Sequence, residues 1–391
     1  MIKNNISIIG GTGHVGLPLG LAFSSKRFQV NLIDINKENI NKVNKGIMPF
    51  IEDNAHKTLK ESLKKKKIIA TNNLSSLKLS KFVIICIGTP IKKNLKPDTK
   101  NFLRFFNELK KYISKDQIII IRSSVFPGIC NKVFKILQSK NLNISYCPER
   151  IVQGKSLIEL PKLPQIISAF NKKAEIQSSI LFKNITKKII ISSILEAELM
   201  KLFSNAYRYI NFSITNNFFK ICKSFNIDYE DLRLKMIDGY ERNTAIPKAG
   251  FSAGPCLLKD TMQLASFSKT KFDLGYAAMD INQKLPIFLI KDLEKKINLK
   301  KETIGILGLS FKADIDDIRD SLSIELISYL KKRKLKFMFN DPYYVDQDNT
   351  SLKELIKKSS IIIVATPHKI FKKIKIPKKK KIIDIWNIIK K

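Results

Sequence analysis

A glycine-rich turn between an apolar strand and a helix constrains this fold more than any other feature. The run Ile6–Gly10 predicts a buried strand, and the stretch from His14 to Ser25 predicts a helix. Between them lies Gly-Thr-Gly-His-Val-Gly, the spacing that lets a backbone approach a pyrophosphate at a helix N-terminus. The predicted contacts of this turn are Gly11, Gly13, Val15 and Gly16.

An acidic residue at the end of the next predicted strand complements the glycine-rich turn. Asp34 ends the next predicted strand, QVNLID, 34 − 16 = 18 residues beyond Gly16. A carboxylate at that place accepts hydrogen bonds from a ribose hydroxyl and repels a 2′-phosphate. We therefore predict that the cofactor is NAD. Two further turns follow strands at the ligand-binding edge of the sheet, and they contain Thr89 and Ser124.

The order of predicted elements indicates an α/β protein. Strands and helices alternate to about Ser193, which is typical of a parallel sheet with helices on both faces. From Leu195 to about Asn226 there is no glycine or proline, which predicts a long helix, and the chain stays helical to about Asn298. A second alternation begins at Thr303. We predict a Rossmann domain at 1–194, a central helical domain at 195–298 and a smaller Rossmann-like domain at 299–391.

The chain is strongly basic, with 71 Lys and Arg against 34 Asp and Glu, a formal net charge of +37. Such a charge attracts nucleic acid or anionic membranes. However, only nine of the 71 cations are arginine, the lysines are spread along the whole chain, and isoleucine and asparagine are abundant, as AT-rich coding DNA favours. Proteins that read DNA bases depend on arginine. We therefore expect no nucleic-acid partner.

The cysteine and hydropathy patterns indicate the cellular compartment of the protein. The five cysteines have neither zinc-site spacing nor a disulfide framework, so we expect a reducing compartment and no metal. Apolar strand residues begin at Ile6, which leaves no room for a signal peptide. The longest apolar runs are too short to span a bilayer. These features predict a cytoplasmic protein with no membrane insertion.

Cys256 is the most informative single residue. It lies in a loop of small residues, Gly250–Cys256, directly before Leu-Leu-Lys-Asp. A nearby lysine and a helix N-terminus make a thiol more nucleophilic, although a loop cysteine alone is only an even bet for a nucleophile. Glu149 follows a strand of the first domain. Lys201 and Asn205 are spaced i, i+4 on one helix face, where a lysine is by default solvated.

Together these residues resemble the UDP-glucose/GDP-mannose dehydrogenase family, the nucleotide-sugar 6-dehydrogenases that include UDP-N-acetylmannosamine dehydrogenases. The resemblance covers essentially the whole chain. It rests on the order and spacing of the stretches GTGHVGLPL, IGTP, SSVFPG, CPERIVQG, EAELMKLFSNAYRYIN, AGPCLLKDT, GLSFKADIDDIRDS and NDPYY.

The resemblance implies an NAD-dependent enzyme that oxidises the C6 hydroxyl of a nucleotide sugar to a carboxylate in two steps. Cys256 would form a thiohemiacetal and then a thioester. Lys201 would stabilise negative charge on the sugar oxygen. Asp260 and Glu149 would handle the proton and the hydrolytic water, and Asn205 and Ser124 would position substrate or water.

Further contacts follow from the same resemblance. The implied substrate-binding residues are Glu149, Arg150, Lys201, Asn205, Arg242, Phe251, Gly254 and Lys312. The implied cofactor contacts beyond the glycine turn and Asp34 are Thr89, Ser124, Lys259 and Arg319. The helical middle is the dimerisation core of the family, so a homodimer is implied.

The sugar signatures are mixed. Arg150 follows Pro-Glu where UDP-glucose enzymes carry phenylalanine, which resembles the enzymes for N-acetylhexosamines. Lys259-Asp260 instead resembles the UDP-glucose pattern. We favour a UDP-N-acetylhexosamine such as UDP-N-acetylmannosamine, with UDP-glucose as the alternative. A hydroxyacid-type dehydrogenase needs neither the cysteine nor the second Rossmann-like domain, and a non-catalytic polyanion-binding protein does not need the catalytic set.

Overall fold

The computed structural model describes residues 5–89, 91, 97–140, 142–268 and 270–389. Pro90, the last residue of the Thr89 turn, lies outside the described residues. The chain forms two compact units, residues 1–204 and 205–391.

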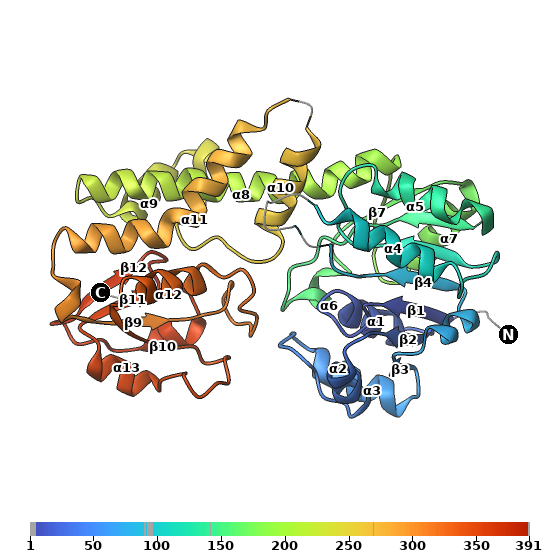
Figure 1. Cartoon of the computed structure of the whole chain (residues 1–391), viewed down its shortest axis with the longest axis horizontal. Coiled ribbons are helices and arrows are strands. Elements are labelled where there is room, and N and C mark those ends of the chain that lie inside the picture. Colours follow the sequence, from blue (N-terminus) through green and yellow to red (C-terminus); the bar gives the residue numbers. More distant parts are fainter. Residues whose placement is uncertain (1–4, 90, 92–96, 141, 269, 390–391) are drawn as a thin grey trace. The chain divides into compact units, whose positions relative to one another are not determined.

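The first unit is built on a sheet of eight strands in the order β3-β2-β1-β4-β5-β6-β7-β8 (Figure 1). The strands are β1 (Asn5–Ile9), β2 (Gln29–Ile33), β3 (Ile68–Thr71), β4 (Phe82–Ile85), β5 (Ile118–Ile121), β6 (Asn143–Tyr146), β7 (Gln165–Ala169) and β8 (Ile189–Ile191). Its helices are α1 (Gly16–Ser24), α2 (Lys37–Asn44), α3 (Ala55–Lys64), α4 (Thr99–Leu109), α5 (Ile129–Leu137), α6 (Ser156–Glu159) and α7 (Lys172–Phe182).

Two details differ from the sequence prediction. Strand β3 was not predicted, because its apolar run is only three residues long and directly follows a lysine-rich stretch. The sheet is also not wholly parallel, since β7 pairs antiparallel with β6. The described connection from Cys147 to Pro164 holds only the four-residue helix α6, and a parallel return needs a longer crossover.

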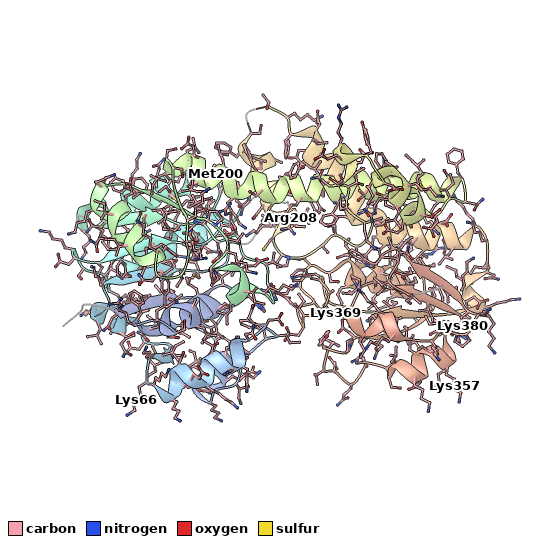
Figure 2. The ribbon with its side chains drawn as sticks, turned by 180° about the vertical axis from the view of Figure 1, so that it is seen from behind. Lys66, Met200, Arg208, Lys357, Lys369 and Lys380 are labelled. Carbon is pink, nitrogen blue, oxygen red and sulfur yellow. The ribbon has the colours of Figure 1, made fainter. Side chains whose placement is uncertain are left out.

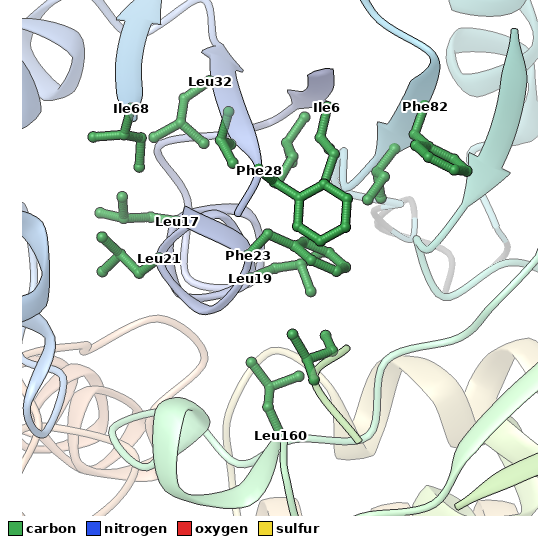
Figure 3. Packing of buried hydrophobic residues seen from close by; sticks show 14 of the residues in the cluster. Ile6, Leu17, Leu19, Leu21, Phe23, Phe28, Leu32, Ile68, Phe82 and Leu160 are labelled. Carbon is green, nitrogen blue, oxygen red and sulfur yellow. The ribbon is translucent and has the colours of Figure 1, made fainter. Parts of the chain in front are cut away.

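Both faces of this sheet are covered. Ile6, Ile8 and Leu32 pack with α1, α2, α3 and α7, while Ile9 and Ile85 on the opposite face pack with α4 and α5. Helix α1 is buried almost all round, as a helix that is apolar on every side should be. It lies against the strands, and Leu160 approaches it from the other side (Figure 3).

The second unit combines helices with a four-stranded parallel sheet, order β10-β9-β11-β12 (Figure 1). Its strands are β9 (Thr303–Leu307), β10 (Lys336–Asn340), β11 (Ile361–Val364) and β12 (Lys381–Asp384). Its helices after α8 are α9 (Tyr229–Ile237), α10 (Leu257–Phe267), α11 (Asp273–Glu294), α12 (Leu322–Lys332) and α13 (Leu352–Lys358). Leu285, Leu289 and Leu293 of α11 share one core with Leu326 of α12 and Ile304 of β9.

The predicted long helix is α8 (Ile194–Ser224), and its first eleven residues belong to the first unit. Figure 2 labels Met200 and Arg208 on either side of the point at which the units divide. The predicted fold class is confirmed: an α/β protein with an N-terminal Rossmann-type sheet, a helical centre and a small C-terminal parallel sheet.

Lysines cover the outside of each unit, as Figure 2 shows for Lys66 in the first and Lys357 and Lys369 in the second. These three side chains are exposed. Across the residues that the structure describes, no helix has the length and apolarity needed to cross a membrane. Within the same residues no group of His, Cys, Asp and Glu could hold a metal ion.

Candidate active site

The glycine turn has the geometry of a pyrophosphate cradle. A Cβ on Gly16 would lie 2.2 Å from the carbonyl oxygen of Gly10, and one on Gly11 would lie 2.6 Å from the carbonyl oxygen of Ile8. These two glycines therefore allow helix and strand to pack closely. A Cβ on Gly13 would meet its nearest atom only at 3.4 Å, so Gly13 faces free space at the start of α1.

Asp34 lies beside this turn. Its Oδ2 accepts a hydrogen bond from the Thr12 backbone N–H at 3.0 Å, and its Oδ1 accepts one from the Asn36 N–H at 3.1 Å. The buried Thr12 hydroxyl has no hydrogen-bond partner within the described part of the chain. Open space at Gly13, an unpartnered hydroxyl and a ribose-type carboxylate fit a dinucleotide such as NAD.

The turns after β4 and β5 are joined at the same edge of the sheet. The Thr89 hydroxyl donates to the backbone oxygen of Ser124, and the Ser123 hydroxyl donates to the oxygen of Ile87 at 2.7 Å. Glu198 of α8 braces the far end of the second turn, because its carboxylate accepts from the N–H groups of Gly128 and Cys130 at 2.6 and 2.9 Å. The structure thus brings Thr89 and Ser124 together in a fixed loop pair.

Glu149 has a different environment from the one that sequence suggested. Its Oε2 accepts from Nε of Arg122 at 2.9 Å and also from Nη2 of Arg122. Its Oε1 accepts from the N–H groups of Arg150 and Ile151 at 2.7 and 3.1 Å. Both oxygens are therefore engaged and the side chain is buried, so the predicted role in proton transfer requires these bonds to open.

Arg122 is the partner that sequence analysis missed. Its guanidinium is fully buried and also donates to the Cys147 backbone oxygen and to Gln165 Oε1, at 3.0 and 2.9 Å. An arginine in the run QIIIIRSS reads as the solvated end of a strand, so the sequence carried no signal of this pair. Arg150, predicted to bind substrate, is half-buried and donates to the Pro164 oxygen. Burial lowers the pKa of Arg150, and Glu149 partly offsets this.

Lys201 is not the solvated lysine that its helix position suggested. Its side chain is buried on α8, with 8% of the residue exposed. Within the described residues the structure gives its ammonium group no hydrogen bond or ion pair. A buried cation without a counterion is suited to stabilising a developing oxyanion.

Cys256 lies at the N-terminus of α10 and is the only exposed cysteine of the five. One turn along the helix, the fully buried Asp260 accepts a hydrogen bond from Asn205 Nδ2 at 2.6 Å. The Lys259 ammonium lies 3.4 Å from the other carboxylate oxygen of Asp260. The cofactor contact that the resemblance implies for Lys259 stays a prediction.

The loop that carries Cys256 is fixed at two glycines. Asn216 holds Gly250 through two hydrogen bonds, at 2.9 and 3.0 Å, and the Trp386 ring fills the space where a Cβ on Gly250 would project. Gly254 has φ +102, and a Cβ there would lie 2.4 Å from the Phe311 ring. Only glycine satisfies both the left-handed backbone and this contact.

The remaining predicted residues have varied environments. Phe251 is 3% exposed and its side chain packs in the core of the second unit. Arg242 is exposed on the short 3-10 helix Glu241–Asn243. Lys312 and Arg319 lie on the loop after β9. Arg319 is ion-paired with Asp317, which raises its pKa, and the nearby Cys256 adds to that rise.

Three models of one family match the chain in order. The NAD binding domain of the UDP-glucose/GDP-mannose dehydrogenase family matches residues 4–190, its central domain 195–284 and its UDP binding domain 305–391. The chain belongs to the UDP-glucose/GDP-mannose dehydrogenase family.

Similar proteins of this family span the whole chain. The UDP-N-acetyl-D-mannosamine dehydrogenase of Pyrococcus horikoshii is 29% identical over 401 residues, 97% of this chain and 95% of that protein. The UDP-glucose 6-dehydrogenase of Rickettsia prowazekii is 26% identical, covering 98% and 95%. The solved structure of the Pyrococcus horikoshii UDP-D-ManNAc dehydrogenase superposes with a TM-score of 0.90 at 28% identity, covering 99% and 96%.

Membership of the dehydrogenase family confirms several predictions. The chain is an oxidoreductase that acts on a CH–OH group of a nucleotide sugar, and its cofactor is NAD. The hydroxyacid-dehydrogenase and polyanion-binding alternatives are wrong. The roles of individual site residues stay predictions.

Proposed function

We propose that this nucleotide-sugar dehydrogenase oxidises carbon 6 of UDP-N-acetylmannosamine to a carboxylate, with four electrons removed in two steps. The observation that carries the proposal is the exposed Cys256 at the N-terminus of α10, one turn from a buried Asp260. An alcohol dehydrogenase that stops at the aldehyde needs no nucleophile, whereas oxidation to the acid is easier through a covalent thioester. The relatives that carry the UDP-N-acetyl-D-mannosamine name support the choice of sugar.

The residues of the first unit hold the cofactor. Gly13 and Thr12 would hold the pyrophosphate, and Asp34 would accept from the adenosine ribose. NAD, when bound, accepts a hydride from carbon 6 in each of the two oxidations. Lys201, a buried cation, stabilises the negative charge that develops on oxygen 6 as its proton leaves.

Cys256 and Asp260 carry the second half of the reaction. The thiolate of Cys256 adds to the aldehyde carbon, a C–S bond forms, and the carbonyl oxygen takes a proton to give a thiohemiacetal. Loss of the carbon-bound hydrogen as a hydride, together with the hydroxyl proton, leaves a thioester. Asp260, held by Asn205, then accepts a proton from the attacking water, the C–S bond breaks, and the thiol and a carboxylate are released.

The test is the number of NADH molecules formed per sugar consumed. Purified protein with NAD is offered UDP-N-acetylmannosamine, UDP-N-acetylglucosamine, UDP-glucose and GDP-mannose in turn. We expect two NADH per UDP-N-acetylmannosamine and the highest kcat/KM with that sugar. A higher kcat/KM with UDP-glucose would reverse the choice of substrate, and one NADH per sugar would overturn the thioester route.

We also propose that the chain forms a homodimer through α8. Tyr207, Ile214, Phe218 and Ile221 of α8 are exposed. Their spacing of 7, 4 and 3 residues places them on one face of the helix. An apolar stripe of this length on a water-facing helix is typical of an association surface.

If the chain dimerises through this stripe, a charge placed within the stripe should lower the molecular mass measured in solution. Ile221→Glu should shift the species measured by light scattering from dimer to monomer, because it places a charge within the apolar stripe. Ile176→Glu is the matched control, since Ile176 is an isoleucine of similar exposure on another helix, α7. A dimer that survives Ile221→Glu, or a wild-type monomer, contradicts this interface.

A further inference from the structure

We infer that Asp341 and His368, which the proposed chemistry does not use, are positioning residues for the loop that carries Cys256. Both side chains are fully buried, on the turns that follow β10 and β11. His368 Nε2 lies 3.0 Å from Asp341 Oδ2. The inference rests on the proposed function, because the position of this loop matters to catalysis only if Cys256 is the nucleophile.

The hydrogen bonds define the tautomer of His368. The backbone N–H of Asp314 donates to His368 Nδ1 at 2.9 Å, so Nδ1 carries no proton. The proton of the neutral ring is then on Nε2, where it is donated to Asp341. A single imidazole therefore links the turn after β10 to the long loop after β9, residues 308–320.

Asp341 anchors the start of that same loop. Its Oδ2 accepts from the N–H groups of Leu309 and Ser310 at 2.6 and 3.0 Å, and its Oδ1 accepts from the Tyr343 N–H at 2.9 Å. Burial alone would raise the pKa of Asp341, but the hydrogen bonds from His368 and the backbone lower it to about 2. The group is therefore an anion at neutral pH, and its charge strengthens these bonds.

The turn after β11 adds one more bond to the loop. The Thr366 hydroxyl donates to the backbone oxygen of Ser310 at 2.6 Å. Further along, the Phe311 N–H donates to the Asp317 oxygen at 3.0 Å, which closes the loop on itself. The Asp341–His368 pair thus determines where Phe311 lies.

Phe311 and its loop touch the segment that carries the nucleophile. The ring occupies the space beside Gly254, and the Gly254 N–H donates to the backbone oxygen of Asp320 at 3.2 Å. Cys256 follows two residues later. A shift of the 308–320 loop must therefore move the turn that precedes Cys256 or break its contacts.

The test replaces His368 and measures Cys256 directly. In His368→Asn the shorter side chain keeps an acceptor near Asp314 but cannot reach Asp341. We expect the rate of Cys256 alkylation by iodoacetamide to fall about threefold or more, because the sulfur is no longer held near Arg319. We expect kcat to fall about tenfold, since small displacements of reacting groups are costly.

A purely stabilising pair would give another pattern. It would lower the melting temperature but leave the alkylation rate and kcat of the folded protein within about twofold of wild type, which overturns the inference. The matched control is His56→Asn, an exposed histidine of α3, which should change nothing.

A milder variant keeps the test decisive if His368→Asn does not fold. Thr366→Val preserves the shape of the buried side chain and removes only its bond to Ser310, so it must slow alkylation in the same direction. Wild-type alkylation in that variant also overturns the inference. The alkylation rate depends on the position of the loop and not on which sugar is oxidised. If alkylation slows in the variant while the wild-type enzyme forms only one NADH per sugar, the proposed function is overturned and the positioning role stands.

Discussion

Cys256→Ala should lower the steady-state rate of NADH formation by about a thousandfold, because the aldehyde then has no thiol with which to form a thioester. Any residual turnover should yield at most one NADH per sugar consumed. The measurement is NADH absorbance together with chromatography of the sugar products. In the wild type, mass spectrometry of enzyme quenched during the first turnover, before hydrolysis, should detect the sugar on Cys256.

The control is Cys222→Ala. Cys222 lies in the hydrophobic core of the second unit, where burial raises the pKa of its thiol. Burial also raises the pKa of Cys86 and Cys147 to about 12 and raises that of Cys130, so iodoacetamide should label Cys256 alone in the folded protein. A Cys256→Ala enzyme that still produces two NADH per sugar at above a tenth of the wild-type rate would refute the covalent route.

Much of the fold was predictable because its signals are local. The glycine turn, the strand ending in Asp34 and the unbroken helix from residue 195 each follow from spacing within a short window. The N-terminus of α10 at Cys256 follows from the Gly- and Pro-containing loop before it. Strand β3 and the antiparallel direction of β7 have no such local signal. The burial of β3 and the direction of β7 depend on neighbouring strands far along the chain.

The site was predictable in its residues but less so in their partners. The bond between Asn205 and Asp260 joins positions 55 residues apart, and the Asp341–His368 contact joins positions 27 apart. Neither spacing belongs to a sequence motif, so neither contact could be predicted from the sequence. Arg122 is the clearest example, because burial turned an apparently solvated strand-end arginine into the counterion of Glu149.

Glu149→Gln distinguishes a catalytic from a structural role for this residue. The variant keeps the shape of the side chain but leaves the Arg122 guanidinium, which is fully buried, without its counterion. Breaking a buried pair in this way costs about 3–5 kcal/mol. For a unit of this size, 1 kcal/mol corresponds to about 2–4 °C, so the melting temperature measured by calorimetry should fall by at least about 6 °C.

Two comparisons make this expectation specific. Glu108→Gln breaks an exposed pair with Lys111 and should leave the melting temperature almost unchanged. Arg122→Met combined with Glu149→Gln removes both charges and should recover about half or more of the stability lost in the single variant, because no unpaired charge then remains buried. Assayed well below its melting temperature, Glu149→Gln should keep kcat within about threefold of wild type. If instead its stability is normal and its kcat collapses, Glu149 exchanges a proton with the substrate, and its bonds to Arg122 must open during turnover.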